Sequence, residues 1–541
     1  MTATLERRSA VLDSQHTGDI RGALGTIRHD DTASRRGGSA YLKTLLAIIG
    51  PGLIVMVGDN DAGAFATYGQ AGQNYGTRLL WTLLLLVPVL YVNQEMVLRL
   101  GAVTGVGHAR LILERFGKFW GAFSVIDLFI LNALTIITEF IGITLAAGFL
   151  GVPRILAVAL AAMVIIGAAF TGSFRRFERM AIGLCLGSLL LIPLYFLAHP
   201  AASQMARGFV TPTLPGGSGG LATVMLLVIG IVGTTVAPWQ LFFQQSYVID
   251  KRITPRFIRY EKADLWIGIV VVILGAAAVM GFTAAAFAGH AGGFTNAGDL
   301  AAGLQAHAGR IAGVLFAVAL LDASIIGAFA VSLSTAYALG DVFGLKHSLH
   351  RGVKGAKGFY AIYGGLVLAA AAVVLIPGSP LGLLTEGVQA LAGVLLPSAA
   401  VYLLLLCNDR EVLGPWVNGL RTNLFTGTVV TVLIALSVIL TASVLDPGIT
   451  ARQIVFILGG CALAGLVGLA AVAAVRLRSG TLGPAAIDRA GRENWRMPPL
   501  TLLRRPAVPL GRKIGMTILR SYLAVATVLV GVKIVELAIA H

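Results

Sequence analysis

Long apolar runs follow one another along most of this chain, and a run of about 20 such residues is long enough to cross a bilayer as a helix. The chain has 541 residues, of which 57% are hydrophobic and 12% are charged, and its mean hydropathy is +0.84. These values lie outside the range of soluble globular proteins. The sequence therefore predicts an all-α polytopic membrane protein.

Taking each apolar run as a span predicts thirteen helices. They lie near residues 44–70, 78–98, 120–149, 153–171, 180–198, 221–248, 264–288, 309–341, 359–377, 382–406, 424–443, 453–475 and 516–538. Residues 1–40 are polar and lack the apolar core and cleavage site of a secretory signal, so we expect a disordered arm in the cytosol.

The formal net charge of +16 comes from basic residues that gather on one side of this topology. The positive-inside rule then places the N-terminus and the basic loops, including residues 251–262 and 476–515, in the cytosol and the protein in the inner, plasma membrane. Contact with phosphate or lipid headgroups explains these loops better than a nucleic-acid surface does. Cys185, Cys407 and Cys461 are far apart and indicate neither a disulfide framework nor a soft-metal site.

Two of the predicted spans are interrupted in their middle. The first carries Gly58-Asp59-Asn60-Asp61-Ala62-Gly63, and the sixth carries Gly233-Thr234-Thr235-Val236-Ala237-Pro238. Non-helical backbone at membrane depth is tolerated where it lines a cavity, and a pair of breaks at corresponding positions indicates an inverted-repeat transporter. We therefore predict a first repeat of five helices over residues 41–200, a second over 201–410, and accessory helices over 411–541.

The negative charges of Asp59 and Asp61, in the first break, are costly to place inside a membrane. A charge at the bilayer centre costs about 2.5–3.5 kcal/mol on insertion scales, so two of them indicate a cation or water nearby. An offset of two residues is about 200° on a helix, and only unwinding lets both side chains reach one cavity. For Asp61 the alternative is to cap the second half-helix, and for Asp59 it is to hold the unwound turn by hydrogen bonds.

The stretch from Gly50 to Gly76 resembles the first helix of the NRAMP family of divalent-metal transporters, in which an Asp-Pro-Gly-Asn motif follows Gly-Pro-Gly by nine positions. The stretch from Gln94 to Gly105 resembles the end of that family's second helix. The resemblance covers residues 44–410. It implies a LeuT-type inverted repeat of helices 1–5 and 6–10, with helices 1 and 6 broken, and it places Asp61 at the family's metal-binding aspartate.

Departures from the family motifs change the expected chemistry. Ala64 stands at the asparagine position, and in the sixth span Ala237 replaces the methionine and Trp239 the histidine of a Met-Pro-His motif. A thioether favours soft transition metals, whereas Mg²⁺ binds oxygen ligands and keeps several of its waters. The two alanines widen the cavity and leave a hard, acidic site. The chain therefore resembles the NRAMP-related magnesium transporter branch.

The resemblance also bears on proton coupling, which in the family involves a chain of titratable groups. Glu139 matches the family's helix-3 glutamate, but Ile136 stands where an acid would precede it, and Trp239 and Gln244 stand where histidines would be expected. We therefore predict import by alternating access without proton coupling. The membrane potential alone supplies about 4.6 kcal/mol for a divalent ion at 100 mV.

The residues predicted to form the metal site combine acids, neutral oxygen donors and the unwound backbone. They are Asp61, Asp59, Gly58, Thr234, Gln240 and Gln389, with Ala64 and Ala237 as cavity-widening replacements and with Glu139, Trp239 and Asp322 as pathway residues. Packing is the alternative role for Gln240, Gln389 and Trp239. No catalytic residue and no resident cofactor are expected.

The sequence is also compatible with two other transport functions. The first alternative is a proton-coupled Mn²⁺ importer of the NRAMP type, and the second is an organic-cation or amino-acid carrier of the same fold. An intramembrane protease is disfavoured, because Ala338-Leu339-Gly340-Asp341 lacks the first glycine of a Gly-x-Gly-Asp motif and the chain has no Tyr-Asp partner. The expected partners are a divalent cation and the lipid bilayer.

Overall fold

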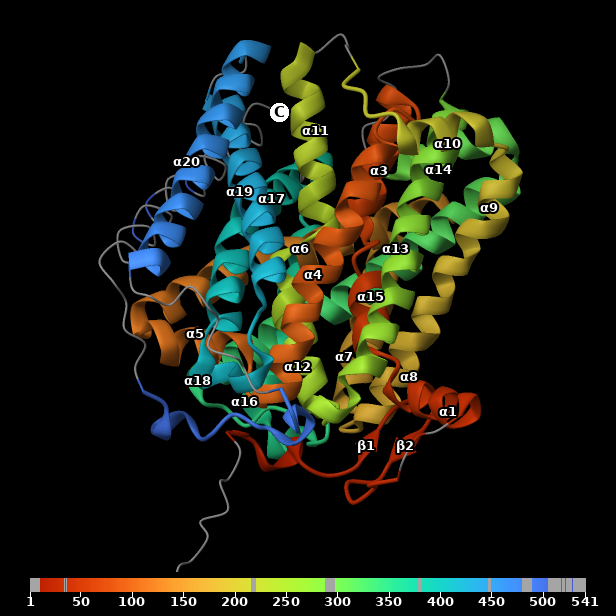
Figure 1. The fold of residues 1–541 in the computed structure, drawn as a ribbon. Coiled ribbons are helices and arrows are strands. Elements are labelled where there is room, and N and C mark those ends of the chain that lie inside the picture. Colours follow the sequence, from red (N-terminus) through yellow and green to blue (C-terminus); the bar gives the residue numbers. More distant parts are fainter. Residues whose placement is uncertain are drawn as a thin grey trace, which may run out of the picture.

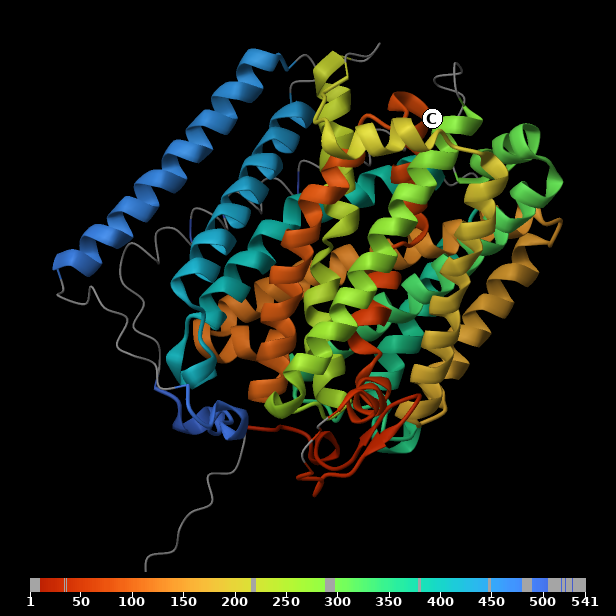
Figure 2. The ribbon, with the colours of Figure 1, turned by 45° about the vertical axis from the view of Figure 1, so that its right-hand side comes forward.

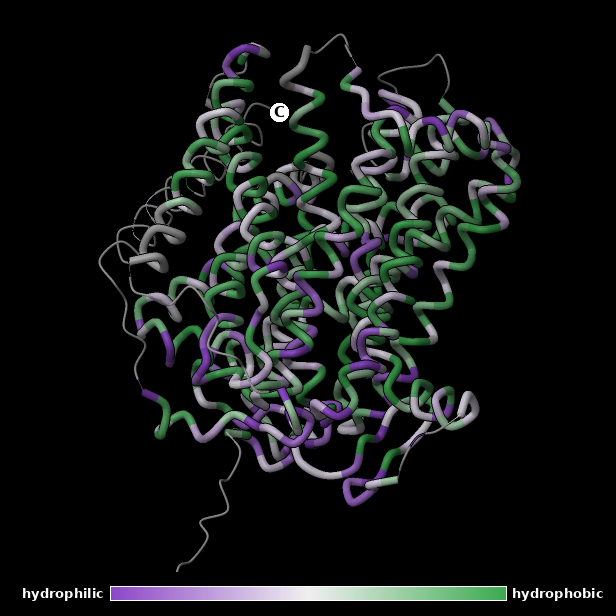
Figure 3. The backbone as a smooth tube through the Cα atoms, viewed as in Figure 1, coloured by the Kyte–Doolittle hydropathy of each residue, from purple (hydrophilic) through white to green (hydrophobic). Residues whose placement is uncertain are grey.

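The protein is a bundle of helices that run roughly parallel to one another (Figure 1). This computed structural model describes residues 10–33, 35, 37–215, 220–287, 297–377, 381–445, 449–478 and 489–504, together with 517, 521 and 528. Apolar residues cover the length of the bundle, and hydrophilic segments gather at the end that carries the N-terminal residues (Figure 3).

The helices of the first half follow the predicted apolar runs closely. They are α1 (Gly38–Ile48), α2 (Pro51–Val57), α3 (Ala62–Tyr75), α4 (Leu80–Thr104), α5 (His108–Phe116), α6 (Lys118–Phe149), α7 (Arg154–Phe170), α8 (Phe174–Cys185), α9 (Leu191–Ala198) and α10 (Ala202–Val210). A 3₁₀ turn, η2 (Leu186–Leu190), joins α8 to α9. Gly105 ends α4 in the left-handed conformation, with φ of 64°, which glycine adopts without steric cost.

The second half has a similar organisation. Its helices are α11 (Gly220–Thr235), α12 (Pro238–Asp250), α13 (Ile258–Ala286), α14 (Ala297–Ala308), α15 (Arg310–Phe343), α16 (Lys357–Val374), α17 (Leu381–Cys407), α18 (Arg410–Leu413), α19 (Leu420–Leu445) and α20 (Ala451–Arg478). In the interior, α15 packs along α6, and α13 packs against α2 and α3. Helices α19 and α20 lie at the edge of the bundle (Figure 2).

Within the described residues, nine helices are long and apolar enough to cross a membrane, or ten if the bent pair α1–α2 forms one span. Two shorter apolar helices, Arg154–Phe170 and Arg452–Gly468, lie where further spans were expected. The first predicted span, near 44–70, is divided among α1, α2 and α3, and the chain bends by 56° between α1 and α2. The expected thirteenth span at 516–538 lies outside the described residues.

The prediction that residues 1–40 are disordered is wrong for residues 10–33, which we call the N-terminal arm. The arm contains a 3₁₀ turn at Ser14–His16 and two antiparallel strands, β1 (Ile20–Arg21) and β2 (Thr26–Ile27). Ile20 and Ile27 face each other across the strands and are both buried. The arm lies across the end of the bundle (Figure 1).

Arginines of the bundle hold the arm mainly through its backbone carbonyls. Arg175 donates to the carbonyls of Gly22 and Gly25, at 3.1 and 3.3 Å. Arg252 donates to the carbonyls of Gln15 and Asp19, at 2.8 and 3.1 Å. Arg179 donates to the Ala23 carbonyl. Arg256 donates to the carbonyls of Asp31 and Ala33. The exception is Arg351, which forms a bidentate ion pair with the Asp13 side chain. The composition of the arm alone does not indicate these arginine partners, because they lie far away in the sequence.

A buried ion pair joins three parts of the chain beneath the arm. Lys251 Nζ lies 2.7 Å from Glu178 Oε1 and donates to the Ile49 carbonyl at 2.8 Å, and both charged side chains are fully buried. Glu178 also accepts from the Ala23 amide at 2.6 Å. The pair thus connects the end of α12, α8, the α1–α2 bend and the arm.

We expect Lys251→Met to lower the free energy of unfolding by about 3–5 kcal/mol, because it leaves the Glu178 carboxylate buried without its cation. Lys262→Met is the matched control, since Lys262 pairs with Glu95 but has a side chain that is 35% exposed, and such pairs contribute about 1 kcal/mol or less. Thermal unfolding of the purified proteins measures both. Equal losses of stability in the two variants would contradict this ranking.

A histidine–aspartate contact, His347 with Asp341, lies at the same end of the bundle. His347, in the loop between α15 and α16, is buried, and its Nε2 lies 3.1 Å from Asp341 Oδ1. Burial alone would lower the pKa of His347, but the hydrogen bond and charge of Asp341, with help from Asp250, raise it to about 9. The rings of His16 and Tyr337 also face this imidazole.

Because the folded pKa of His347 lies above the value of about 6.5 in an unfolded chain, its stabilising contribution is present in full below pH 6.5 and is lost as the pH rises to about 9. The shift corresponds to about 3 kcal/mol. We expect the unfolding temperature of the native chain to fall more between pH 6.5 and pH 9 than that of His347→Gln. Parallel falls in the two proteins would show that another group governs this pH range.

Candidate ion site

The first candidate element is the gap between α2 and α3. Helix α2 ends at Val57 and α3 begins at Ala62, so residues 58–61 form a tight turn rather than a continuous helix. Asp61 is the N-cap of α3, and its Oδ1 accepts from the Ala64 amide at 2.8 Å. Asp59 and Asp61 are both buried. The predicted unwinding is therefore present, and Asp61 has the capping role that the sequence offered as an alternative.

The second element is the gap between α11 and α12, which ends at Pro238. Proline at the first position of α12 has no amide hydrogen to leave unpaired. One turn into α12, Gln240 donates to Asp59 Oδ1 and to the Thr235 carbonyl, the latter at 3.3 Å. Tyr68 of α3 and Thr235 share a hydrogen bond of 2.7 Å. The two breaks thus contact each other directly.

Glu139 of α6 lies at this junction. Its Oε2 accepts from the Ala62 amide at 3.2 Å, which places the carboxyl group beside Asp61, the preceding residue. A Cβ on Gly327 of α15 would come within 2.7 Å of this carboxyl carbon, so glycine there makes room for it. Two acids from α3 and α6 therefore share one buried position.

Gln389 reaches the same junction from α17. A Cβ on Gly63 would lie 1.7 Å from Gln389 Nε2, which means that the amide occupies the space left by this glycine. The same Cβ would lie 3.3 Å from Asp61 Oδ1. The structure thus brings Gln389 next to Asp61, although the two residues are far apart in the sequence.

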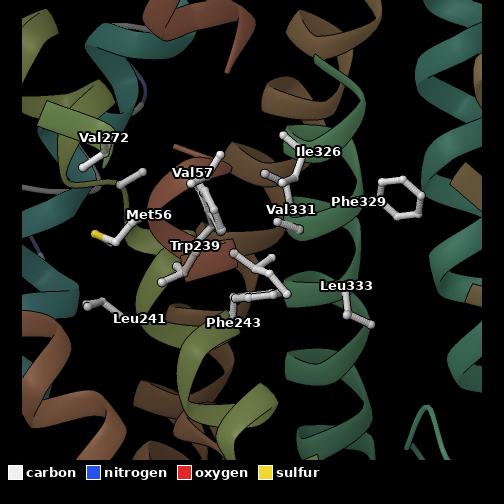
Figure 4. Packing of buried hydrophobic residues seen from close by; sticks show 14 of the residues in the cluster. Met56, Val57, Trp239, Leu241, Phe243, Val272, Ile326, Phe329, Val331 and Leu333 are labelled. Carbon is white, nitrogen blue, oxygen red and sulfur yellow. The ribbon is translucent and has the colours of Figure 1, made fainter. Parts of the chain in front are cut away.

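Trp239 packs beside the first break. Its ring lies near Val57 and Phe243 (Figure 4), and a Cβ on Gly58 would lie 3.6 Å from Trp239 Cη2. The side chain is 1% exposed, and the Trp239 carbonyl accepts from Ser334 at 2.9 Å. Ala64 and Ala237 are also buried, so neither small side chain faces open solvent.

Asp322 is the predicted residue that lies apart from the junction. It is half-buried on α15 and borders the η2 turn, where a Cβ on Gly187 would come within 2.0 Å of its Oδ2. Asn60, between the two aspartates, lines the same cavity as Asp322. Asp322 therefore belongs to a separate pocket behind the first break.

Several polar atoms at the junction have no hydrogen-bond partner among the described residues. They are Asp59 Oδ2, Glu139 Oε1 and Thr234 Oγ1, and all three are buried. Such atoms are costly to bury unless something satisfies them. In the described part of the chain, no three His, Cys, Asp or Glu side chains are close enough to hold a metal ion by themselves.

The sequence missed one supporting residue. Gln94 of α4 donates to Gln240 Oε1 at 2.9 Å, which orients the Gln240 amide so that its nitrogen points to Asp59. In the sequence, Gln94 is an uncharged amide in the middle of an apolar run. Polar side chains in such runs face other helices, and this could have indicated its role. Its partner cannot be read from the sequence, because Gln240 lies 146 positions away.

Two broken helices that meet at a buried acidic junction inside a bundle of membrane-crossing helices define a membrane transporter. A family model described as "Natural resistance-associated macrophage protein-like", or Nramp, matches residues 52–443. The chain belongs to the Nramp family.

The alignments with two curated relatives include most of the length of each relative. The divalent metal cation transporter MntH of Burkholderia ambifaria is 29% identical over 432 residues, which is 75% of this chain and 90% of the relative. The divalent metal cation transporter MntH of Ralstonia nicotianae is 30% identical over 407 residues, which is 70% of this chain and 87% of the relative.

A solved structure shares the fold. The Eremococcus coleocola manganese transporter superposes with a TM-score of 0.62 at 20% identity, over 83% of this chain and 98% of that one. The prediction of an all-α membrane protein with a LeuT-type inverted repeat is therefore confirmed.

Proposed function

We propose that this chain imports divalent metal cations across the plasma membrane by alternating access, with Mg²⁺ as its first substrate and Mn²⁺ as its second. The observation that carries the proposal is the set of unpartnered oxygens on Asp59, Glu139 and Thr234, buried where the two broken helices meet. Buried oxygens without donors are suited to a cation. The relatives described as divalent metal cation transporters support the substrate class.

The preference for Mg²⁺ rests on what the junction offers as ligands. Its side chains supply carboxylate, hydroxyl and amide oxygens, whereas Ala237 places no sulfur at the second break. Mg²⁺ usually binds through one or two carboxylates and retains several waters. Asp61 and Asp59 would supply those carboxylates, with carbonyls such as that of Gly58, the amides of Gln240 and Gln389, and water completing the shell.

Import needs no second ion if the membrane potential drives it. We place the N-terminal arm and the arginine-rich end of the bundle in the cytosol, in accordance with the positive-inside rule. A divalent ion then gains about 4.6 kcal/mol on moving inward at 100 mV. The proposal is therefore facilitated transport, not catalysis and not obligatory proton symport.

A proton-coupled Mn²⁺ importer is the second candidate, and one contact favours it. Asp61 and Glu139 are neighbouring buried carboxyl groups, because Glu139 accepts from the amide of Ala62, which follows Asp61, and a proton on either group removes the repulsion between two negative charges. If the arriving ion displaces that proton, metal and proton movements are linked. The third candidate, an amine or amino-acid carrier, has no comparable contact in its favour.

Reconstitution into liposomes distinguishes these functions. The protein is placed in vesicles with an internal Mg²⁺-sensitive dye or an internal pH probe, and a potassium gradient with valinomycin sets an inside-negative potential. We expect Mg²⁺ influx that grows with the potential and causes no internal acidification. Acidification that accompanies every metal influx would support the second candidate, and flux of an organic amine without metal flux would support the third. Competition by Ca²⁺ measures selectivity.

A further inference from the structure

A cavity with a mostly apolar wall lies behind the break in the first helix. It is formed by Val57, Asn60 and Phe65 at the break, by Ser188 and Leu191 at the η2 turn, and by Ala319, Asp322, Ala323 and Ile326 of α15. The space in it that the centre of a water-sized sphere can occupy is about 10 Å³, which is room for about one water or ion. Three of these residues carry side-chain oxygens, in a wall that is otherwise apolar.

The carboxylate of Asp322 is the charged group of this cavity. Asp322 lies near the middle of α15, a helix long enough to cross the membrane, and no hydrogen bond or ion pair joins it to any other described residue. A Cβ on Gly187 would come within 2.0–2.6 Å of both carboxylate oxygens and the carboxyl carbon, so only glycine leaves space for them. An unpaired charge at this depth requires a counter-ion or a proton.

Asn60 supplies an independent observation. It is 3% exposed, its Nδ2 donates to the Val272 carbonyl at 3.2 Å, and its Oδ1 has no partner among the described residues. The bond to Val272 fixes which amide atom is the oxygen, because a flipped amide would place two acceptors against each other. The residue lines the cavity through this otherwise unsatisfied side chain.

Ser188 is the third oxygen. Ser188 lines the cavity, and its hydroxyl donates to the Cys185 carbonyl at 2.6 Å, so its hydrogen is already used and its oxygen can act only as an acceptor. The η2 turn therefore brings Gly187, which makes room for the carboxylate, next to Ser188, which adds an acceptor. The cavity thus collects acceptors from three elements.

We propose that Asp322, Asn60 and Ser188 form a second ion site that takes a monovalent alkali cation, Na⁺ in the first instance. A single carboxylate balances a single positive charge, whereas a divalent ion would leave a net charge at membrane depth. A proton on Asp322 could bond only one of the other acceptors, whereas a metal ion contacts all three oxygen groups. The bound ion also connects the first break, through Asn60, to α15 and η2.

Thermal unfolding of the full-length protein in detergent tests this site without requiring transport. NaCl is titrated against choline chloride at constant ionic strength and constant pH, and the unfolding midpoint is recorded. For the native chain we expect a saturable rise of the midpoint with Na⁺. Asp322→Asn should abolish the rise, and Asn60→Ala or Ser188→Ala should increase the apparent Kd for Na⁺ by about tenfold, which is a loss of about 1.4 kcal/mol.

Two controls separate this site from its surroundings. Glu114→Gln removes a carboxylate that pairs with Arg110 on the surface and should keep the full Na⁺ effect. Asp61→Asn alters the proposed transport site and should keep it as well, so that failure of the transport proposal leaves this one standing.

Several outcomes would overturn the proposal. An Na⁺ response that survives in Asp322→Asn, Asn60→Ala and Ser188→Ala would remove the site. A midpoint that responds to pH but not to Na⁺ would identify a proton as the counter-ion, and a response that depends on Asp322 but requires Mg²⁺ would identify a divalent ion. If Asp322→Asn does not fold, the Asn60 and Ser188 variants still decide the question.

Discussion

Asp61→Asn is expected to reduce divalent-cation influx into proteoliposomes by about two orders of magnitude while the protein remains folded. Loss of a buried charge partner costs about 3 kcal/mol or more, which corresponds to roughly that factor in binding. Asparagine is as good an N-cap as aspartate, so the variant keeps the cap on the Ala64 amide that begins α3. The substitution therefore removes the charge and retains the local structure.

The control for Asp61→Asn is Glu114→Gln, which also exchanges one carboxylate for an amide but on the surface of α5. It should transport at the native rate. The unfolding midpoints of both variants establish that the proteins are folded. Native transport in Asp61→Asn would mean that this residue only caps the helix, which was the alternative offered by the sequence.

Ala237→Met is expected to change selectivity and not merely activity. A thioether at the second break adds a soft donor beside the carboxylates and narrows the space available to a hydrated ion. We expect Mg²⁺ influx to fall by about tenfold, equivalent to about 1.4 kcal/mol, and Cd²⁺ influx to rise. Dyes sensitive to each metal measure the two fluxes in matched vesicle preparations.

Ala237→Leu is the matched control for the methionine variant, because leucine is of similar size and has no sulfur. It should reduce both fluxes. A rise of Cd²⁺ influx in both variants would show that cavity size sets selectivity, and no change in either would show that residue 237 does not face the ion. Either result would contradict the role that we assign to Ala237.

Apolar periodicity predicted most of the membrane helices to within a few residues, because length and hydropathy determine what can cross a bilayer. The two breaks were also predictable, since Asp59, Asp61 and Pro238 are incompatible with an uninterrupted helix in lipid. The N-terminal arm was not. Its order depends on arginines more than 140 positions away, such as Arg175, and local composition carries no trace of them.

The candidate site was only partly predictable, again because some of its contacts join residues that are far apart in the sequence. Family motifs and spacing pointed to Asp61, Gln389 and Glu139, but they did not show that the Glu139 carboxylate accepts from the Ala62 amide, directly after Asp61. The contact of Gln240 with Asp59 depends on how α12 meets the first break. The sequence offered Asp322 as a pathway residue, and the cavity that it shares with Asn60 emerges only from packing.

The N-terminal arm is held through its main chain more than through its side chains, and this affects which mutations it can accept. The carbonyls of Gly22, Ala23 and Gly25 are present whatever residue occupies those positions. The exposed side chains of the arm should therefore be replaceable, but not the buried Ile20 and Ile27, nor Gly18, whose φ of 122° disfavours other residues. Gly22 and Gly25 should also resist replacement, since a Cβ on Gly22 would lie 2.1 Å from the Ala47 carbonyl oxygen and one on Gly25 would lie 2.9 Å from Ala47 Cβ. A saturation-mutagenesis map of this segment should show intolerant columns at residues 18, 20, 22, 25 and 27 and tolerance at its exposed positions.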